Sequence, residues 1–133
     1  DLTGKEVRWV NRQAGSGTRV WLDDQWAAAG IDPEQIQGYE REEATHMGVA
    51  QAVNDSLATA GLGIQAAAAA YGLQFIPLTE EHYQLVVPEN VWQTPAWEAA
   101  LVTLRSSAFA SAVAELGGYN IAGAGEATWS HEM

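Results

Sequence analysis

The sequence contains no cysteine among its 133 residues. It therefore offers no disulfide framework, no thiolate metal site and no thiol nucleophile. The absence of cysteine does not decide the compartment, because cysteine-free chains are compatible with reducing and with oxidising surroundings. No basic-then-apolar leader opens the sequence, which starts Asp1-Leu2-Thr3. We expect a cytoplasmic protein; a processed periplasmic or extracellular chain, or an excised domain, is the alternative.

Cations are scarce, with 6 basic residues against 17 acidic ones and a net charge of -11 at pH 7. This balance disfavours nucleic acid and anionic membrane surfaces as partners, since both are bound through clustered Lys and Arg. Four of the six cations fall within the first 19 residues, at Lys5, Arg8, Arg12 and Arg19. They either focus positive potential on the neighbouring loop or are ordinary solvated charges, and the sequence favours neither interpretation.

Long apolar runs are also missing. The longest lies within Ala66–Tyr71, whereas a transmembrane helix needs about 20 apolar residues. We therefore expect no membrane span. A hydrophobic content of 47% over 133 residues is enough for one globular domain with a sizeable core.

Short apolar segments alternate with segments of helical spacing. The pattern predicts strands over 6–11, 38–40, 60–64, 73–78 and 83–87, and a loop over the acidic stretch 40–43. It predicts helices over 18–29, 45–53, 65–71, 96–105 and 107–116, a short helical turn after Pro33, and a tail over 119–133. This alternation is typical of an α/β fold with a largely parallel sheet. The pattern changes near Thr79, which divides the chain into residues 1–79 and 80–133.

The run NRQAGSGTR, residues 11–19, lies between a predicted strand and a predicted helix. The start of a helix presents unpaired N–H groups and partial positive charge, which suit an anion. Gly15 and Gly17 allow a ligand to approach the backbone closely, while Ser16 and Thr18 add hydroxyl donors. The alternative is that a hydroxyl of this loop does no more than cap the helix.

A second helix is predicted to begin at Thr45, which offers another hydroxyl and more free N–H groups. Two such openings that converge would form an anion pocket, although Thr45 considered alone is more simply a cap. Glu43 and His46 have the spacing of half a di-iron site, but the second copy that such a site needs is missing. We therefore expect no metal site.

Residues Gly61–Ala66 match the G-x-G-x-x-A pattern of dinucleotide-binding loops. A nucleotide-dependent enzyme that uses this segment is therefore an alternative. Against it, residues 54–60 are too polar to form the buried first strand that such a fold requires.

Several runs together resemble the PBP-like domain, of the type II periplasmic-binding-protein fold, that is fused to molybdate-type transcriptional regulators and to molybdopterin-biosynthesis proteins. These runs follow one another in the family's order over nearly the whole chain: NRQAGSGTR, GYEREEATH, AGLGIQAAAAAYGLQFIPL, YQLVVP and LRSSAFASAVAELGGYNIAGAGE.

The resemblance implies a two-lobed fold, of which residues 1–79 are the second lobe and residues 80–133 the crossover and C-terminal part of the first. It implies binding of a small oxyanion such as molybdate, tungstate or sulfate, with no catalysis and no other cofactor. The ligand-binding residues that it implies are Ser16, Gly17, Thr18 and Thr45, with Arg12 and Arg19 as supporting charges. The alternative is an interaction module of a larger regulator that binds no ligand.

The sequence departs from the family in two respects. The segment that supplies most of the first lobe does not precede Asp1, so we expect a fragment of a larger protein, or a homo-oligomer in which a second copy completes the cleft. In addition, Glu40, Glu42 and Glu43 lie just before Thr45 and would repel an anion unless they point away.

Overall fold

A computed structural model describes residues 6–127, and the chain divides into two compact units, Asp1–Ile76 and Pro77–Met133. Each unit is described by itself. Whether the units correspond to the lobes of a two-lobed protein stays a prediction. Of the four clustered cations, Lys5 lies outside the described residues.

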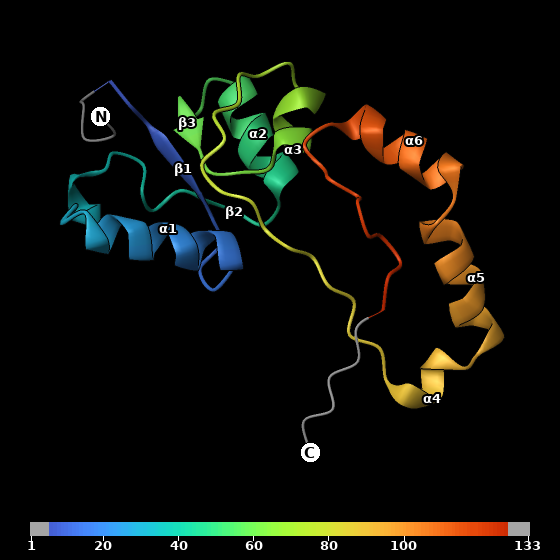
Figure 1. The fold of residues 1–133 in the computed structure, drawn as a ribbon. Helices are drawn as coiled ribbons and strands as arrows, with labels where there is room; N and C mark the ends of the chain where they lie inside the picture. Colours follow the sequence, from blue (N-terminus) through green and yellow to red (C-terminus); the bar gives the residue numbers. More distant parts are fainter. Residues whose placement is uncertain (1–5, 128–133) are drawn as a thin grey trace. The chain divides into compact units, whose positions relative to one another are not determined.

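The first unit is built on a small parallel sheet of three short strands (Figure 1). β1 (Trp9–Arg12) lies in the middle, with β2 (Glu42–Glu43) on one side and β3 (Ala60–Gly61) on the other. Asn11 is in register with Glu42, and Trp9 with Ala60. The predicted α/β class and parallel sheet are confirmed.

Helices cover both faces of the sheet. Neighbouring residues of a strand point to opposite sides, so the apolar neighbours Trp9 and Val10 of β1 each need a helix to pack against. Trp9 packs with Leu22 and Trp26 of α1 (Gly17–Ala28). Val10 packs with Val49 and Ala52 of α2 (His46–Asn54) on the other face. α3 (Gln65–Ala70) lies beside α2, and a short helix η1 (Pro33–Gln35) follows α1 (Figure 1). The predicted helices and the turn after Pro33 are thus confirmed.

Asn11 is the fully buried polar residue at the centre of this unit. Its Oδ1 accepts a hydrogen bond of 2.7 Å from the Trp9 indole, and its Nδ2 donates one of 2.6 Å to the Tyr39 carbonyl. Because both ends of the amide are bonded, burial of Asn11 does not cost an unsatisfied polar group. Asn11 thereby ties β1 to the turn that precedes β2.

Two strand predictions near residue 40 were wrong. Residues 38–40 form a turn, as Gly38 adopts a φ of +88°, and a Cβ at this position would collide with the Trp9 carbonyl. The acidic stretch expected to be a loop contains β2 instead. Pairing with β1 overrides the poor strand propensity of glutamate, and the Glu42 carboxylate is bound by Arg19.

The strands predicted over 73–78 and 83–87 were also wrong, as both segments are irregular and largely exposed. Their apolar residues include Ile76, Leu85 and Val86, which are 79%, 70% and 96% exposed. A strand needs a neighbour to pair its backbone groups, and no strand lies beside these segments within residues 6–127.

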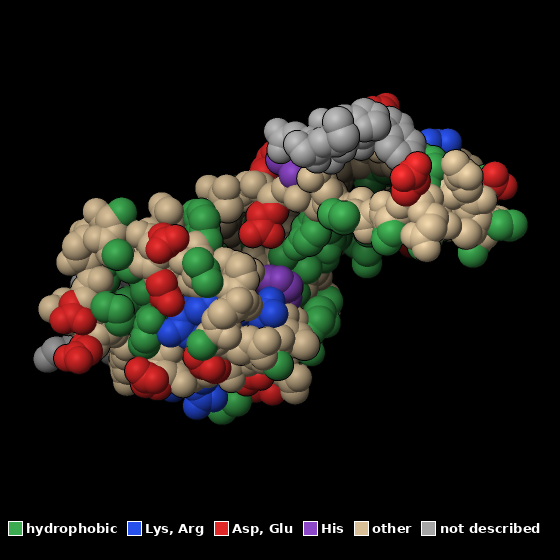
Figure 2. All heavy atoms as spheres, turned by 90° about the horizontal axis from the view of Figure 1, so that it is seen from below, with side chains coloured by type: hydrophobic (Ala, Val, Ile, Leu, Met, Phe, Trp, Pro, Cys, Tyr) green, Lys and Arg blue, Asp and Glu red, His purple; other side chains and the backbone are tan. Residues whose placement is uncertain are grey.

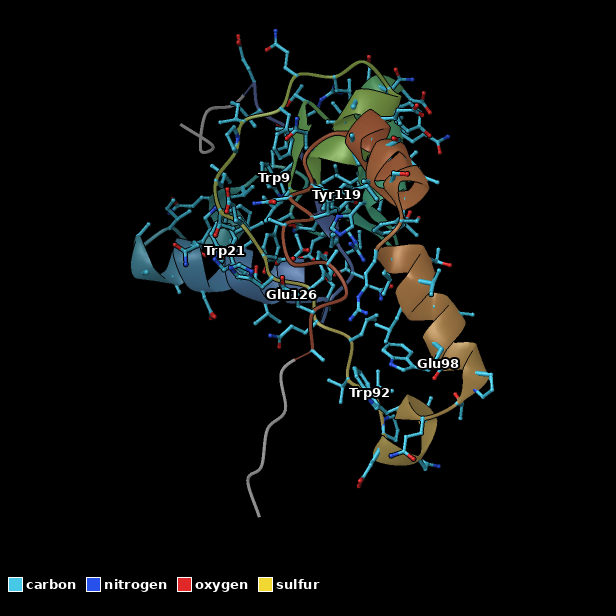
Figure 3. The ribbon with its side chains drawn as sticks, turned by 45° about the vertical axis from the view of Figure 1, so that its right-hand side comes forward. Trp9, Trp21, Trp92, Glu98, Tyr119 and Glu126 are labelled. Carbon is cyan, nitrogen blue, oxygen red and sulfur yellow. The ribbon has the colours of Figure 1, made fainter. Side chains whose placement is uncertain are left out.

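Over residues 77–127, the second unit contains three helices: α4 (Glu89–Trp92), α5 (Pro95–Leu104) and α6 (Ser107–Leu116). Thr94 and Ser106 cap α5 and α6, and Pro95 occupies the first turn of α5. Trp92, which is labelled in Figure 3, packs at a tilt against Trp97, with ring centroids 5.6 Å apart. None of the three helices carries a buried residue. The predicted tail has no helix or strand over 119–127, and residues 128–133 lie outside the described residues.

In the part of the chain that the structure describes, no single helix has the length and apolar character to cross a membrane. α5 and α6 together, bent by 57° at their junction, meet these criteria by length and composition alone.

Gly61 provides a test of the packing between the sheet and α2. A Cβ at residue 61 would lie 2.7 Å from a methyl group of Val10 and 2.7 Å from one of Val49. We expect Gly61→Ala to lower the free energy of unfolding by about 1–3 kcal/mol through overpacking, as measured by denaturant titration. Gly17→Ala is the matched control, since a Cβ there meets nothing within 4 Å, and its effect should stay within about 0.5 kcal/mol. Equal stability of both variants would contradict this account.

Candidate functional site

Each strand of the sheet leads at its carboxyl end towards a helix, so three loops meet at one edge. Backbone N–H of Gln13 donates to the Glu43 carbonyl at 3.0 Å, which joins the first loop to the second. Gly63 of the third loop lies near the start of α2, as a Cβ there would be 3.9 Å from His46 Nδ1. This edge of a parallel sheet is where α/β proteins bind ligands. The predicted convergence of the two helix openings is consistent with this topology.

The opening of α1 leaves two backbone amides available. Ser16 Oγ accepts a hydrogen bond from Arg19 N at 3.3 Å, and the Ser16 carbonyl accepts one from Val20 N at 3.0 Å. The amides of Gly17 and Thr18 make no hydrogen bond within residues 6–127. Gly15, with a φ of +81°, turns the chain before the helix.

α2 opens in the same way. Thr45 Oγ1 accepts from Gly48 N at 2.9 Å, and the Thr45 carbonyl accepts from Val49 N at 3.2 Å. The Met47 amide has no acceptor in the described part of the chain. Ser16 and Thr45 are therefore helix caps, which was the alternative interpretation of both. Capping uses a lone pair of each hydroxyl and leaves its O–H free to donate.

Arg19 is engaged with the protein itself. Its side chain is 9% exposed; Nε binds the Asp23 carboxylate at 2.9 Å, and Nη1 binds Glu42 Oε1 at 3.0 Å. Nη1 also donates to the Arg12 carbonyl at 3.3 Å, and the guanidinium carbon lies 4.3 Å from the centroid of the Tyr39 ring. Burial acts to lower the pKa of Arg19, but hydrogen bonds and charge interactions with Tyr39 and Asp23 outweigh it, so the pKa is raised. The guanidinium thus stays charged.

Arg12 is less engaged. Its Nη2 donates to the Ala44 carbonyl at 3.0 Å, which places the guanidinium beside the loop that leads into α2. Its Nε is buried without a hydrogen-bond partner among the described residues. No carboxylate of residues 6–127 lies within ion-pair distance of Arg12. Its charge is therefore not compensated by a direct partner.

One of the three acidic residues before Thr45 is held by an ion pair. Glu42 binds Arg19. Glu43 lies beside the first turn of α2, where its Oε2 would be 2.9 Å from a Cβ placed on Gly48. Glu43 also lines a shallow hollow of about 160 Å³ together with Gly48, Gln51, Ala52, Asp55 and Leu57. Two carboxylates in its lining make this hollow unsuitable for an anion.

The face in Figure 2 shows few Lys and Arg side chains, which lie among acidic ones rather than in a broad basic patch. In the described residues, no three His, Asp or Glu side chains gather as a metal-ligand set.

The segment proposed for nucleotides has a packing role. Gly61 lies within β3 rather than in the turn after it, and it makes room for Val10 and Val49. α3 follows with six residues and no side-chain cap.

Sequence reasoning did not find the contacts of Arg19 with Glu42 and Tyr39, or the role of Asn11. Both join residues that are far apart in the chain. The Arg19–Asp23 pair could have been found, since its i,i+4 spacing puts the two side chains on one helix face.

Comparisons with known proteins agree with the geometry at the level of the fold. A family model described as a PBP superfamily domain matches residues 1–105. The chain is similar to the uncharacterized protein YvgK of Bacillus subtilis, with 35% identity over 119 residues that cover 90% of this chain and 38% of that protein. It is also similar to an uncharacterized protein from the 5′ region of a 2Fe-2S ferredoxin gene of Clostridium pasteurianum, at 32% identity over 80% of this chain and 96% of that protein. No solved structure matches.

Removal of the Arg19 side chain should weaken the first unit. We expect Arg19→Ala to lower the free energy of unfolding by about 1–2 kcal/mol, a value reduced by the solvent exposure of both carboxylates. A raised pKa means that the contribution is complete below the unfolded-state pKa and is lost only as pH rises through the folded-state pKa. The loss should therefore be the same at neutral and at mildly alkaline pH.

Denaturant titration at both pH values tests this prediction. Arg41→Ala is the control, because Arg41 is exposed and its side chain makes no ion pair within residues 6–127. A loss for Arg41→Ala as large as that for Arg19→Ala would refute the structural role of Arg19.

Proposed function

This chain belongs to the PBP superfamily of domains, and from that premise we propose that it binds a small tetrahedral oxyanion without transforming it. The observation that carries the proposal is the pair of helix openings at one sheet edge, with the amides of Gly17, Thr18 and Met47 unbonded within the described residues. Amides at helix starts bind anions without any need for a basic patch.

The donors of this edge replace the water molecules around the anion. The amides of Gly17 and Thr18, the hydroxyls of Ser16, Thr18 and Thr45, and the Arg12 guanidinium all donate and carry no negative charge. A fully deprotonated oxyanion needs donors on every side, and this set would supply those of one side. Molybdate and tungstate are the ligands that the family resemblance favours, and sulfate has the same shape.

The chain spans 38% of the length of the Bacillus relative that it matches. We propose that the first unit is one half of a cleft in a larger carrier or sensor, and that closure of a second lobe reports occupancy. The rest of a longer polypeptide or a second copy of the chain would supply that lobe.

A second candidate function is an assembly module that binds no ligand. The exposed apolar residues of the second unit favour it: Leu85, Val86 and Val102 are 70%, 96% and 71% exposed. Exposed apolar side chains in such numbers are typical of surfaces that contact other proteins.

Calorimetric titration with molybdate, tungstate, sulfate and phosphate separates the two functions. We expect heat from at least one anion, and Thr18→Val should weaken its binding roughly tenfold or more, because a hydrogen bond to a charged group is lost. Thr103→Val on α5 is the matched control, since it removes a hydroxyl that bonds only the Ala99 carbonyl, and it should leave the affinity unchanged. The titrations are repeated on the longest natural form of the protein, and the absence of heat with all four anions there would rule out oxyanion binding.

A further inference from the structure

We propose that the two arginines beside the first loop have different roles. Arg19 is a positioning residue that fixes the α1 opening against β2, and Arg12 is the charge by which the site prefers a dianion to a monoanion. This inference rests on the proposed oxyanion binding and specifies which residue determines ligand charge.

Arg19 has little charge to offer a ligand. Its guanidinium is bound by the carboxylates of Asp23 at 2.9 Å and Glu42 at 3.0 Å, so the three groups together carry a net charge of about -1. A dianion brought near this cluster would gain no net attraction. Arg19 is also nine-tenths buried, which limits direct contact with a bound anion.

The contacts of Arg19 instead join three parts of the site. Asp23 belongs to α1, Glu42 to β2, and the Arg12 carbonyl, 3.3 Å from Nη1, ends β1. The Tyr39 ring covers the guanidinium and donates its hydroxyl to Asp23 at 3.1 Å. A shift of α1 along the sheet edge would break these contacts at once. Arg19 thereby sets where the amides of Gly17 and Thr18 point.

Arg12 has the opposite properties. It has no ion-pair partner in residues 6–127, and its bond to the Ala44 carbonyl holds it between the loops that lead into α1 and α2. Its Nη1 makes no hydrogen bond in the described part of the chain, and its buried Nε has no partner there either. A guanidinium that keeps unbonded donors and has no ion-pair partner within residues 6–127 is suited to distinguish ligands by their charge.

Tungstate and perrhenate allow the effect of ligand charge to be measured apart from that of ligand shape. Both are tetrahedral oxyanions of nearly equal size, but tungstate carries two negative charges and perrhenate one. We expect Arg12→Gln to weaken tungstate binding roughly tenfold to a hundredfold. Perrhenate binding should fall by about the square root of that factor, because the Coulomb energy scales with ligand charge. The preference for the dianion therefore decreases. Arg19→Lys should weaken both anions by the same factor and leave the preference unchanged.

Isothermal titrations of the wild type and the variants give both affinities, and thermal unfolding verifies that each variant is folded. Arg41→Gln is the matched control and should change neither affinity. A nitrogen-15 NMR titration of the wild type adds an independent measurement, which decides the question even if Arg19→Lys does not fold. Tungstate should shift the Nε resonance of Arg12 much more than that of Arg19.

The outcomes are distinguishable. If the wild type binds neither anion, the proposed function fails and this inference fails with it. If the wild type binds, an unchanged preference in Arg12→Gln, a changed preference in Arg19→Lys or a larger NMR shift at Arg19 overturns the division of roles alone.

Discussion

The buried guanidinium of Arg19 is the contact on which the candidate site depends. It lies between two carboxylates, one on α1 and one on β2, and under the ring of Tyr39. Tyr39 is in turn held by Asn11, whose amide donates to its carbonyl from the centre of the sheet. A charge so buried is stable only when its partners are fixed, and the same requirement fixes α1 against β1 and β2.

A protein with a net charge of -11 is an unusual place for an anion site. The proposed site reconciles the two by using helix-start dipoles and a single arginine in place of a basic patch. Unbonded amides at helix starts attract an anion over a few ångströms, and Glu42 is bound by Arg19. The Glu43 carboxylate, in contrast, lies beside the first turn of α2 and opposes an anion at that opening. Such a site favours small anions and offers nothing to a polyanion, whose binding requires clustered cations.

The two units differ in how far they bury their apolar side chains. The first buries Trp9, Trp26, Val10 and Val49 on two faces of one sheet. The second has helices without buried residues and an irregular segment with exposed apolar side chains. A strand pattern alone was not enough to form strands over 73–78 and 83–87, because strand formation depends on a neighbouring strand.

The sequence by itself determined the features that depend on near neighbours: the helix starts near Ser16 and at Thr45, a strand that leads into NRQAGSGTR, and the α/β class. Helix capping and apolar periodicity depend on residues a few positions apart, so both can be predicted from the sequence. Only the tertiary structure decided that Glu42–Glu43 is a strand, that Arg19 rather than Arg12 binds Glu42, and that Gly61 serves packing. These outcomes depend on contacts between residues distant in sequence, and no local pattern encodes which carboxylate a buried arginine will meet.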